Sequence, residues 1–210
     1  LLGYLETRMQ KIYKKDLKFS IIAGLLTGSI VWRLTIFLDI PEIFNVPYII
    51  LIPLIPVIWF AGVNLGYFLG LFFKPFDQFG KFVAVGFTNA AVDFGVLNLA
   101  IYFSGVSAGI LYAVFKAVSF LIAMFNSYVL NKYWTFEAGK SKGGPSEFIR
   151  FASVAVLSVL VNVGVASLVV NFIDPIGGLN SNGWANIGAI AGSAAALFFS
   201  FIGFRRVFKK

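Results

Sequence analysis

The apolar run FSIIAGLLTGSIVWRLTIFL at residues 19–38 decides the fold class of this chain. Roughly 20 residues is the length that an α-helix needs to cross the hydrocarbon core of a bilayer. The polar, basic residues 1–18 precede the run, and no small-residue cleavage site is obvious after it. We therefore expect a retained membrane span rather than a signal peptide.

Apolar runs of similar length recur along the whole chain. The other predicted spans are residues 46–73, 81–103, 108–130, 148–173 and 184–204. Pro53 and Pro56 predict a kink in the second span. The chain is 59% hydrophobic and 12% charged, whereas a soluble domain has about 25% charged residues. The sequence therefore predicts an all-α, polytopic membrane protein with about six transmembrane helices.

The positive charges give the chain an orientation. All but two of the 17 Lys and Arg residues lie at the two ends and in the second and fourth connections. The other connections have no Lys or Arg, and Asp39, Glu42 and Asp174 lie there. Since positive residues mark the cytoplasmic side, we expect both ends in the cytoplasm and a multi-pass location in the cytoplasmic (plasma) membrane. The net charge of +8 is then an orientation signal, and we predict no nucleic-acid partner.

The third and fifth spans share a sequence pattern. KFVAV at residues 81–85 aligns with RFASV at 150–154, and VDFGV at 92–96 aligns with VNVGV at 161–165, with one offset of 69 for both pairs. This pattern predicts that the last four helices are a parallel repeat of two-helix units. We expect a basic cytoplasmic N-terminus at residues 1–18, an additional transmembrane hairpin at 19–78 and a four-helix domain at 79–210.

The composition excludes most catalytic and metal chemistry. The chain has no Cys and no His, which removes thiolate chemistry, the usual zinc ligands and the commonest general base. Its acidic residues are scattered singly, and it has no glycine-rich phosphate loop. We predict no metal, no cofactor and no enzymatic activity.

Three ionisable residues lie inside predicted spans: Arg33, Asp93 and Lys116. A charge at the bilayer centre costs about 2.5–3.5 kcal/mol on insertion scales, so each residue is a candidate for function. Asp93 and Lys116 lie at similar depth on adjacent antiparallel spans, where an ion pair would either lock two helices together or hold Lys116 ready for an anionic ligand. Arg33 lies near the end of its span, where it would either snorkel to the surface or bind a ligand.

Polar and small residues continue these helix faces. Ser119, Ala123, Asn126 and Ser127 follow Lys116 at helical spacing, and Asn89 lies one turn before Asp93. Such stripes either line a hydrophilic groove or join helices by hydrogen bonds. The small-residue pairs Gly24/Gly28, Gly62/Gly66/Gly70 and Gly188/Gly192 predict close helix contacts. Such contacts form either within one chain or between copies, so the sequence leaves open whether the protein is a homo-oligomer.

Two motifs resemble a known family. FGKFVAVGFTNAAVDFGV at residues 79–96 and FNSYVLNKYWTF at residues 125–136 are similar to the GtrA-like family, a four-span module also found fused to dolichol-phosphate-mannose synthases. The resemblance implies a role in cell-surface polysaccharide or glycolipid synthesis. Asp93, Lys116, Asn126 and Asn131 fall on the motif positions that it carries over. The first two spans lie outside the module, and Asn162 replaces Asp93 in the second half.

The leading hypothesis is flippase-like transport of a polyprenyl-phosphate-linked sugar. We expect its ligand-binding residues to be Lys116, Asp93, Asn126, Asn89, Asn131 and Arg33, with this sugar lipid and membrane lipids as partners. The alternative is a non-catalytic membrane subunit that anchors or positions a partner glycosyltransferase. A third hypothesis is a transporter of ions or small molecules that uses Asp93 as a proton-linked carboxylate.

Overall fold

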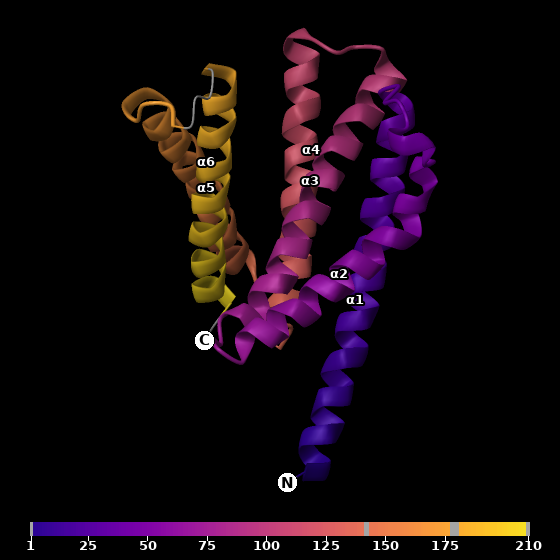
Figure 1. The fold of residues 1–210 in the computed structure, drawn as a ribbon, viewed down its shortest axis with the longest axis vertical. Helices are drawn as coiled ribbons and strands as arrows, with labels where there is room; N and C mark the ends of the chain where they lie inside the picture. The colour runs from indigo at the N-terminus through magenta and orange to yellow at the C-terminus, as the bar shows by residue number, and fades with distance from the viewer. Residues whose placement is uncertain (1, 141–142, 177–180, 209–210) are drawn as a thin grey trace. The chain divides into compact units, whose positions relative to one another are not determined.

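The computed structural model describes residues 2–140, 143–176 and 181–208 and shows an all-helical chain over these ranges (Figure 1). Its long helices are α1 (Leu2–Phe37), α2 (Leu51–Gly70), α3 (Phe76–Ser104), α4 (Gly109–Leu130), α5 (Pro145–Phe172) and α6 (Ser181–Phe208). Each of the six contains a segment long and apolar enough to cross a membrane. The predicted fold class is confirmed: the chain is an all-α, multi-pass membrane protein.

The helices extend beyond several of the predicted spans. α1 begins at Leu2, so the polar residues before the first span continue the same helix. Lys, Arg, Glu, Gln and Leu dominate this stretch and are good helix formers, and no proline interrupts it. The apolar run marks only the part of a helix that suits lipid, and therefore it underestimates the length of α1.

The second span begins later than its apolar run suggests. Two short 3₁₀ turns, η1 (Ile43–Asn45) and η2 (Tyr48–Ile50), come before α2. Pro53 lies in the first turn of α2, where its missing N–H leaves no helix bond unmade. Pro56 lies inside the helix and is buried.

A π-helical turn, η3 (Asn131–Thr135), follows α4 directly. The Phe136 N–H donates to the Asn131 carbonyl oxygen at 2.9 Å, which is the wider bond of a π-turn. Within η3, Asn131, Trp134 and Thr135 are buried. Glu137 then takes the left-handed conformation with φ of 53°, so the chain leaves the helix at this residue.

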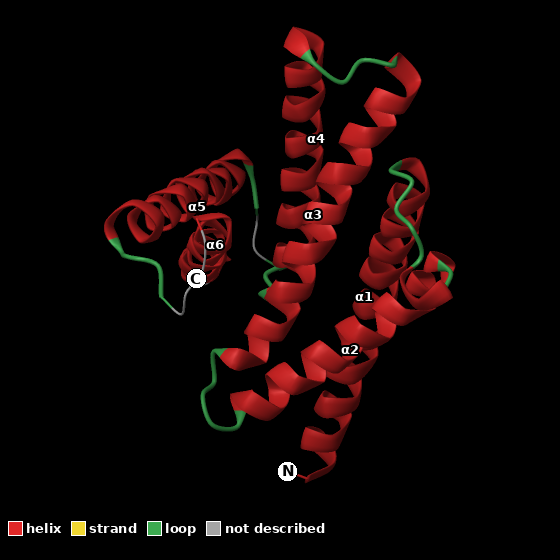
Figure 2. Cartoon of the chain, turned by 45° about the horizontal axis from the view of Figure 1, so that its top comes forward, coloured by secondary structure: helices red, strands yellow, loops and turns green. Residues whose placement is uncertain are grey.

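The chain divides into two compact units after Glu137. In the first unit, α1 packs against α2 and α3, α2 packs against α3, and α3 packs against α4 (Figure 2). Its core gathers at one end around Trp134, whose ring stacks on Phe19 with centroids 5.6 Å apart. The core cluster consists of Ala23, Val63, Ala84, Val85, Leu130 and Trp134.

Glycines set the close approach of α1 to α2. A Cβ added at Gly28 would lie 2.5 Å from the Leu51 carbonyl oxygen, and one added at Gly24 would overlap the backbone of Pro56. Only glycine allows two helix backbones to come this near. The predicted close contacts are confirmed here. Gly62 also lies at a close helix contact, because a Cβ added at Gly80 would lie 2.6 Å from the Gly62 carbonyl oxygen, but a Cβ on Gly62 itself would meet no atom within 4 Å.

The second unit is the hairpin of α5 and α6. Phe151 stacks on Phe204 with ring centroids 4.2 Å apart, and the Trp184 indole N–H donates to the Ile173 carbonyl oxygen at 2.9 Å. Gly192 again marks a close approach, because a Cβ there would overlap the Asn162 carbonyl oxygen. The predicted repeat, the membrane orientation and the predicted domain limits remain predictions.

Candidate functional site

Asp93 on α3 and Lys116 on α4 form an ion pair. Lys116 Nζ lies 2.5 Å from Asp93 Oδ2. The hydroxyl of Ser119, which is fully buried, donates to Asp93 Oδ1 at 2.6 Å. The sequence predicted the nearness of Asp93 and Lys116, and the structure confirms their pairing. Ser119 completes the contact because it lies three residues after Lys116, on the same face of α4.

Both oxygens of the Asp93 carboxylate are engaged, and the Lys116 ammonium keeps free donors. Each carboxylate oxygen of Asp93 already accepts one hydrogen bond, from Lys116 and from Ser119. A Lys ammonium has three donors, and within the described part of the chain Asp93 is its one acceptor. The side chain of Lys116 is 41% exposed and that of Asp93 is 20% exposed. Lys116 can therefore bind an anion while the Asp93 carboxylate fixes the position of the Lys116 ammonium group.

The pair lies well inside the span. Asp93 is 11 residues before Ser104, the last residue of α3, which is about 16 Å along the helix. Lys116 is seven residues after Gly109, the first residue of α4, or about 10 Å. Phe94 contributes an aromatic face, with its ring centroid 5.7 Å from Lys116 Nζ. Both charges therefore lie about two helical turns or more from the connection between α3 and α4.

The three candidate asparagines do not join this pair directly. Asn89 Oδ1, Asn126 Nδ2 and Asn131 Oδ1 are buried without a hydrogen-bond partner in the described residues. Asn89 is one turn from Asp93, but Asn131 is 15 residues from Lys116, or about 22 Å along the helix. Asn131 also donates to the Ser127 carbonyl oxygen at 2.9 Å. The structure thus brings Asp93, Lys116 and Ser119 together, whereas the three asparagines lie apart from the pair on α3, α4 and η3.

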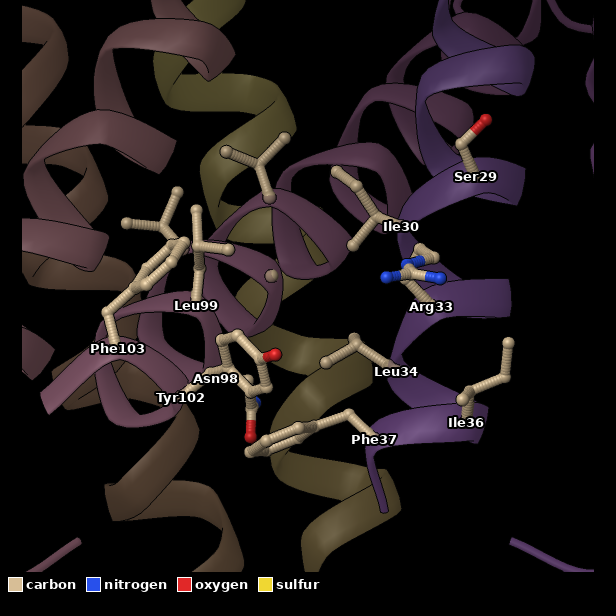
Figure 3. Close-up of a pocket in the computed structure, with 13 residues that line it drawn as sticks. Ser29, Ile30, Arg33, Leu34, Ile36, Phe37, Asn98, Leu99, Tyr102 and Phe103 are labelled. Atoms are coloured by element: carbon tan, nitrogen blue, oxygen red, sulfur yellow. The ribbon is translucent and has the colours of Figure 1, made fainter. Parts of the chain in front are cut away.

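Arg33 lies in a different place. It projects from α1 and lines a cavity between α1 and α3 (Figure 3). Its guanidinium carbon is 5.6 Å from the centroid of the Trp32 ring. On α3 the cavity is lined by Val92, Val96 and Leu99 among others, whereas Asp93 reaches α4. Arg33 and Lys116 therefore belong to separate sites on two faces of α3.

A sequence comparison assigns the segment that contains Asp93 and Lys116 to a family. The family model of the GtrA/DPMS transmembrane domain matches residues 81–208, which is more than half of the chain. The chain belongs to the GtrA/DPMS transmembrane-domain family. The predicted family resemblance is confirmed, and α3 to α6 carry the GtrA/DPMS match while α1 and α2 lie outside it. Membership relates this membrane protein to glycosyl-lipid processes.

One curated protein is also similar. It is YngA of Bacillus subtilis (strain 168), described as an uncharacterized membrane protein, with 30% identity over 112 residues. The similar region covers 49% of this chain and 72% of YngA. No solved structure matches the chain.

A second charged cluster, missed by sequence reasoning, joins the GtrA/DPMS segment to the two helices outside it. Lys81 Nζ lies 2.9 Å from Asp16 Oδ1 and 3.2 Å from Glu137 Oε1. The Trp134 indole N–H donates to Asp16 Oδ1 at 3.0 Å, and the Tyr67 hydroxyl donates to Asp16 Oδ2 at 2.5 Å. The side chains of Lys81 and Asp16 are only 4% and 2% exposed.

The lysines around Asp16 in the sequence explain why this cluster was not predicted. Asp16 stands among Lys14, Lys15 and Lys18, so the sequence assigns it to the basic cytoplasmic N-terminus at residues 1–18. A usable signal was present, because Asp16, Ser20, Ala23 and Thr27 follow each other at helical spacing and all four are buried. Small and polar residues at that spacing mark a face that packs against another helix.

Proposed function

We propose that this chain carries a polyprenyl-phosphate-linked sugar across the membrane and that Lys116 binds the phosphate of this lipid. In this proposal the chain is a carrier in the plasma membrane and performs no catalysis. The observation that supports it is the state of Lys116: a partly exposed ammonium inside a span, held by a single carboxylate.

Family and charge support the same class of ligand. Membership in the GtrA/DPMS family relates the chain to glycosyl lipids. A lipid phosphate needs a cation within the membrane, and charge-assisted hydrogen bonds to phosphate are roughly twice as strong as neutral ones. Lys116 provides this cation. Before the phosphate binds, the Asp93 carboxylate compensates the positive charge of Lys116.

The asparagines supply a second requirement of a sugar carrier. A sugar needs hydrogen-bonding groups along its route, and Asn89 and Asn126 hold buried amide atoms without a partner on the two helices that carry the ion pair. An unpaired buried polar atom costs about 1–3 kcal/mol. Sugar hydroxyls passing along α3 and α4 would satisfy these atoms.

The test is binding of a short-chain polyprenyl-phosphate sugar to purified protein. Lys116→Ala should weaken binding tenfold or more, because a hydrogen bond to a charged group contributes about 1.5–3 kcal/mol and about 1.4 kcal/mol is a factor of ten. Lys140→Ala is the matched control, since Lys140 is an exposed lysine outside the helices. It should bind like the unmodified protein.

A double variant separates binding from helix pairing. Lys116→Ala alone leaves Asp93 unpaired, which can destabilise the protein for structural reasons. Lys116→Ala with Asp93→Asn removes both charges, and a neutral amide remains beside Ser119. This variant should recover normal protein levels without recovering sugar-lipid binding or transport. Normal binding and transport by the double variant would overturn the carrier proposal and favour the glycosyltransferase-partner alternative.

A further inference from the structure

A cavity of about 790 Å³ lies between α1 and α3 (Figure 3). Neither Asp93 nor Lys116 is among the residues that line it. One of its walls belongs to α1, which is outside the GtrA/DPMS match. The proposed carrier function does not use this cavity. Its apolar walls are formed by Ile30, Leu34, Phe37, Val92, Val96 and Leu99.

Arg33 is the one charged residue among those that line the cavity. Within the described part of the chain, no carboxylate lies within 4.0 Å of its guanidinium. A guanidinium carries five N–H donors in a planar fork that matches a phosphate. An uncompensated guanidinium beside apolar walls is therefore electrostatically complementary to an anion that brings its own apolar part.

Arg33 and the inner apolar wall of the cavity lie at different distances from the helix ends. Arg33 lies four residues before Phe37, the end of α1, or about 6 Å along the helix. Tyr102 lies two residues before Ser104, the end of α3, or about 3 Å. Val92 is 12 residues from the same end, or about 18 Å. The charge thus lies near the membrane surface, and the apolar walls continue toward the bilayer centre.

The cavity suits a phosphate better than a sugar. Apart from Arg33, its polar side chains are Ser29, Asn98 and Tyr102. The Asn98 amide already donates to the Phe94 carbonyl oxygen at 2.8 Å. Few groups are left to hydrogen-bond several sugar hydroxyls, whereas a single phosphate is satisfied by the guanidinium alone.

We infer that this cavity binds an anionic phospholipid, with the phosphate at Arg33 and an acyl chain along Leu34, Val92 and Val96. Tyr102, which is 66% exposed, lies beside Phe37 at the rim, with ring centroids 5.9 Å apart. These two rings border the opening at the depth that aromatic residues favour in membranes. The bound lipid would connect α1 to the family domain at this end of the span.

The experiment is native mass spectrometry of the purified protein in neutral detergent, with phosphatidylglycerol or phosphatidylcholine added. The unmodified protein should retain phosphatidylglycerol at least tenfold better than phosphatidylcholine. Arg33→Gln should abolish this preference, and Arg33→Lys should keep part of it. Leu99→Trp, which adds bulk at an exposed wall position, should reduce retention without changing the charge.

Two controls make the test decisive. Lys140→Gln removes an exposed lysine outside the helices and should retain phosphatidylglycerol like the unmodified protein, so a loss seen with Arg33→Gln is specific to the cavity. Excess inorganic phosphate should not displace the lipid, because the acyl chain contributes to binding. Equal retention of both lipids, normal retention by Arg33→Gln, or displacement by phosphate alone would overturn the assignment.

Discussion

Asp16 and Lys81 form an almost completely buried ion pair, and they show how much a single residue matters in this chain. Asp16 accepts bonds from three side chains: Lys81, Tyr67 and Trp134. These come from α3, α2 and η3, so one carboxylate connects four elements. Removing one partner of a buried pair costs about 3–5 kcal/mol, because the remaining charge loses its compensation.

We expect Asp16→Ala to lower the thermal stability of the detergent-solubilised protein. The loss should lie at the lower end of that range, about 3 kcal/mol, because Lys81 keeps its contact with Glu137. Glu42→Ala is the control, since Glu42 is an exposed carboxylate on a connection and its φ of −61° suits alanine. Thermal unfolding followed by tryptophan fluorescence measures both. A melting temperature for Asp16→Ala equal to that of the control would show that the cluster contributes no stability.

At the scale of elements, the additional hairpin is held by shape as well as by charge. Gly24 and Gly28 bring α1 against the α2 backbone, and the Thr27 hydroxyl donates to Thr88 Oγ1 on α3 at 3.0 Å. The Trp59 indole on α2 donates to the same oxygen at 3.2 Å. Thr88 thus receives one hydrogen bond from each helix of the hairpin, which indicates that the hairpin packs as an integral part of the first unit.

Gly28→Leu should separate α1 from α2, because the new Cβ would meet the Leu51 carbonyl oxygen and the Ile52 Cα at no more than 2.9 Å. The matched control is Gly62→Leu, where the Cβ position is open within 4 Å. We expect lower yield and faster proteolysis of the Gly28 variant only. Equal behaviour of the two variants would argue against close α1–α2 packing.

The two family hairpins have comparable polar contacts. In α3 and α4, Ser119 donates to Asp93 at 2.6 Å; in α5 and α6, Asn162 Nδ2 lies 3.5 Å from Ser193 Oγ. Asn162 is the residue that the sequence aligns with Asp93. The duplication stays a prediction from the sequence, and at the aligned position the second hairpin carries a neutral amide instead of a carboxylate.

At the scale of the whole molecule, the predicted orientation follows from charge alone and has a direct test. The chain has no Cys, so a single introduced cysteine reports its own accessibility. In intact cells, Asp174→Cys should react with a membrane-impermeant thiol reagent, whereas Lys140→Cys should react only after the membrane is opened. The reverse pattern would invert the topology, and reaction of both in intact cells would contradict the span count between them.

The sequence by itself determined the class of the protein, the number of spans and the family. Apolar length and charge placement are properties of single segments, and each segment is accommodated in the bilayer according to its own length and flanking charges. The nearness of Asp93 and Lys116 was also predictable, because a short connection between antiparallel helices fixes which depths face each other.

Only the tertiary structure decided which faces of these helices meet. In the sequence, Asp16 lies 65 residues from Lys81 and 118 residues from Trp134. The cavity at Arg33 lies between α1 and α3, which α2 separates in the sequence. Such contacts depend on how each helix is rotated about its axis and on how closely glycines allow two helices to approach. A hydropathy pattern contains neither kind of information. In a membrane, close packing and hydrogen bonding choose these faces, because lipid is as apolar as the side chains it would replace.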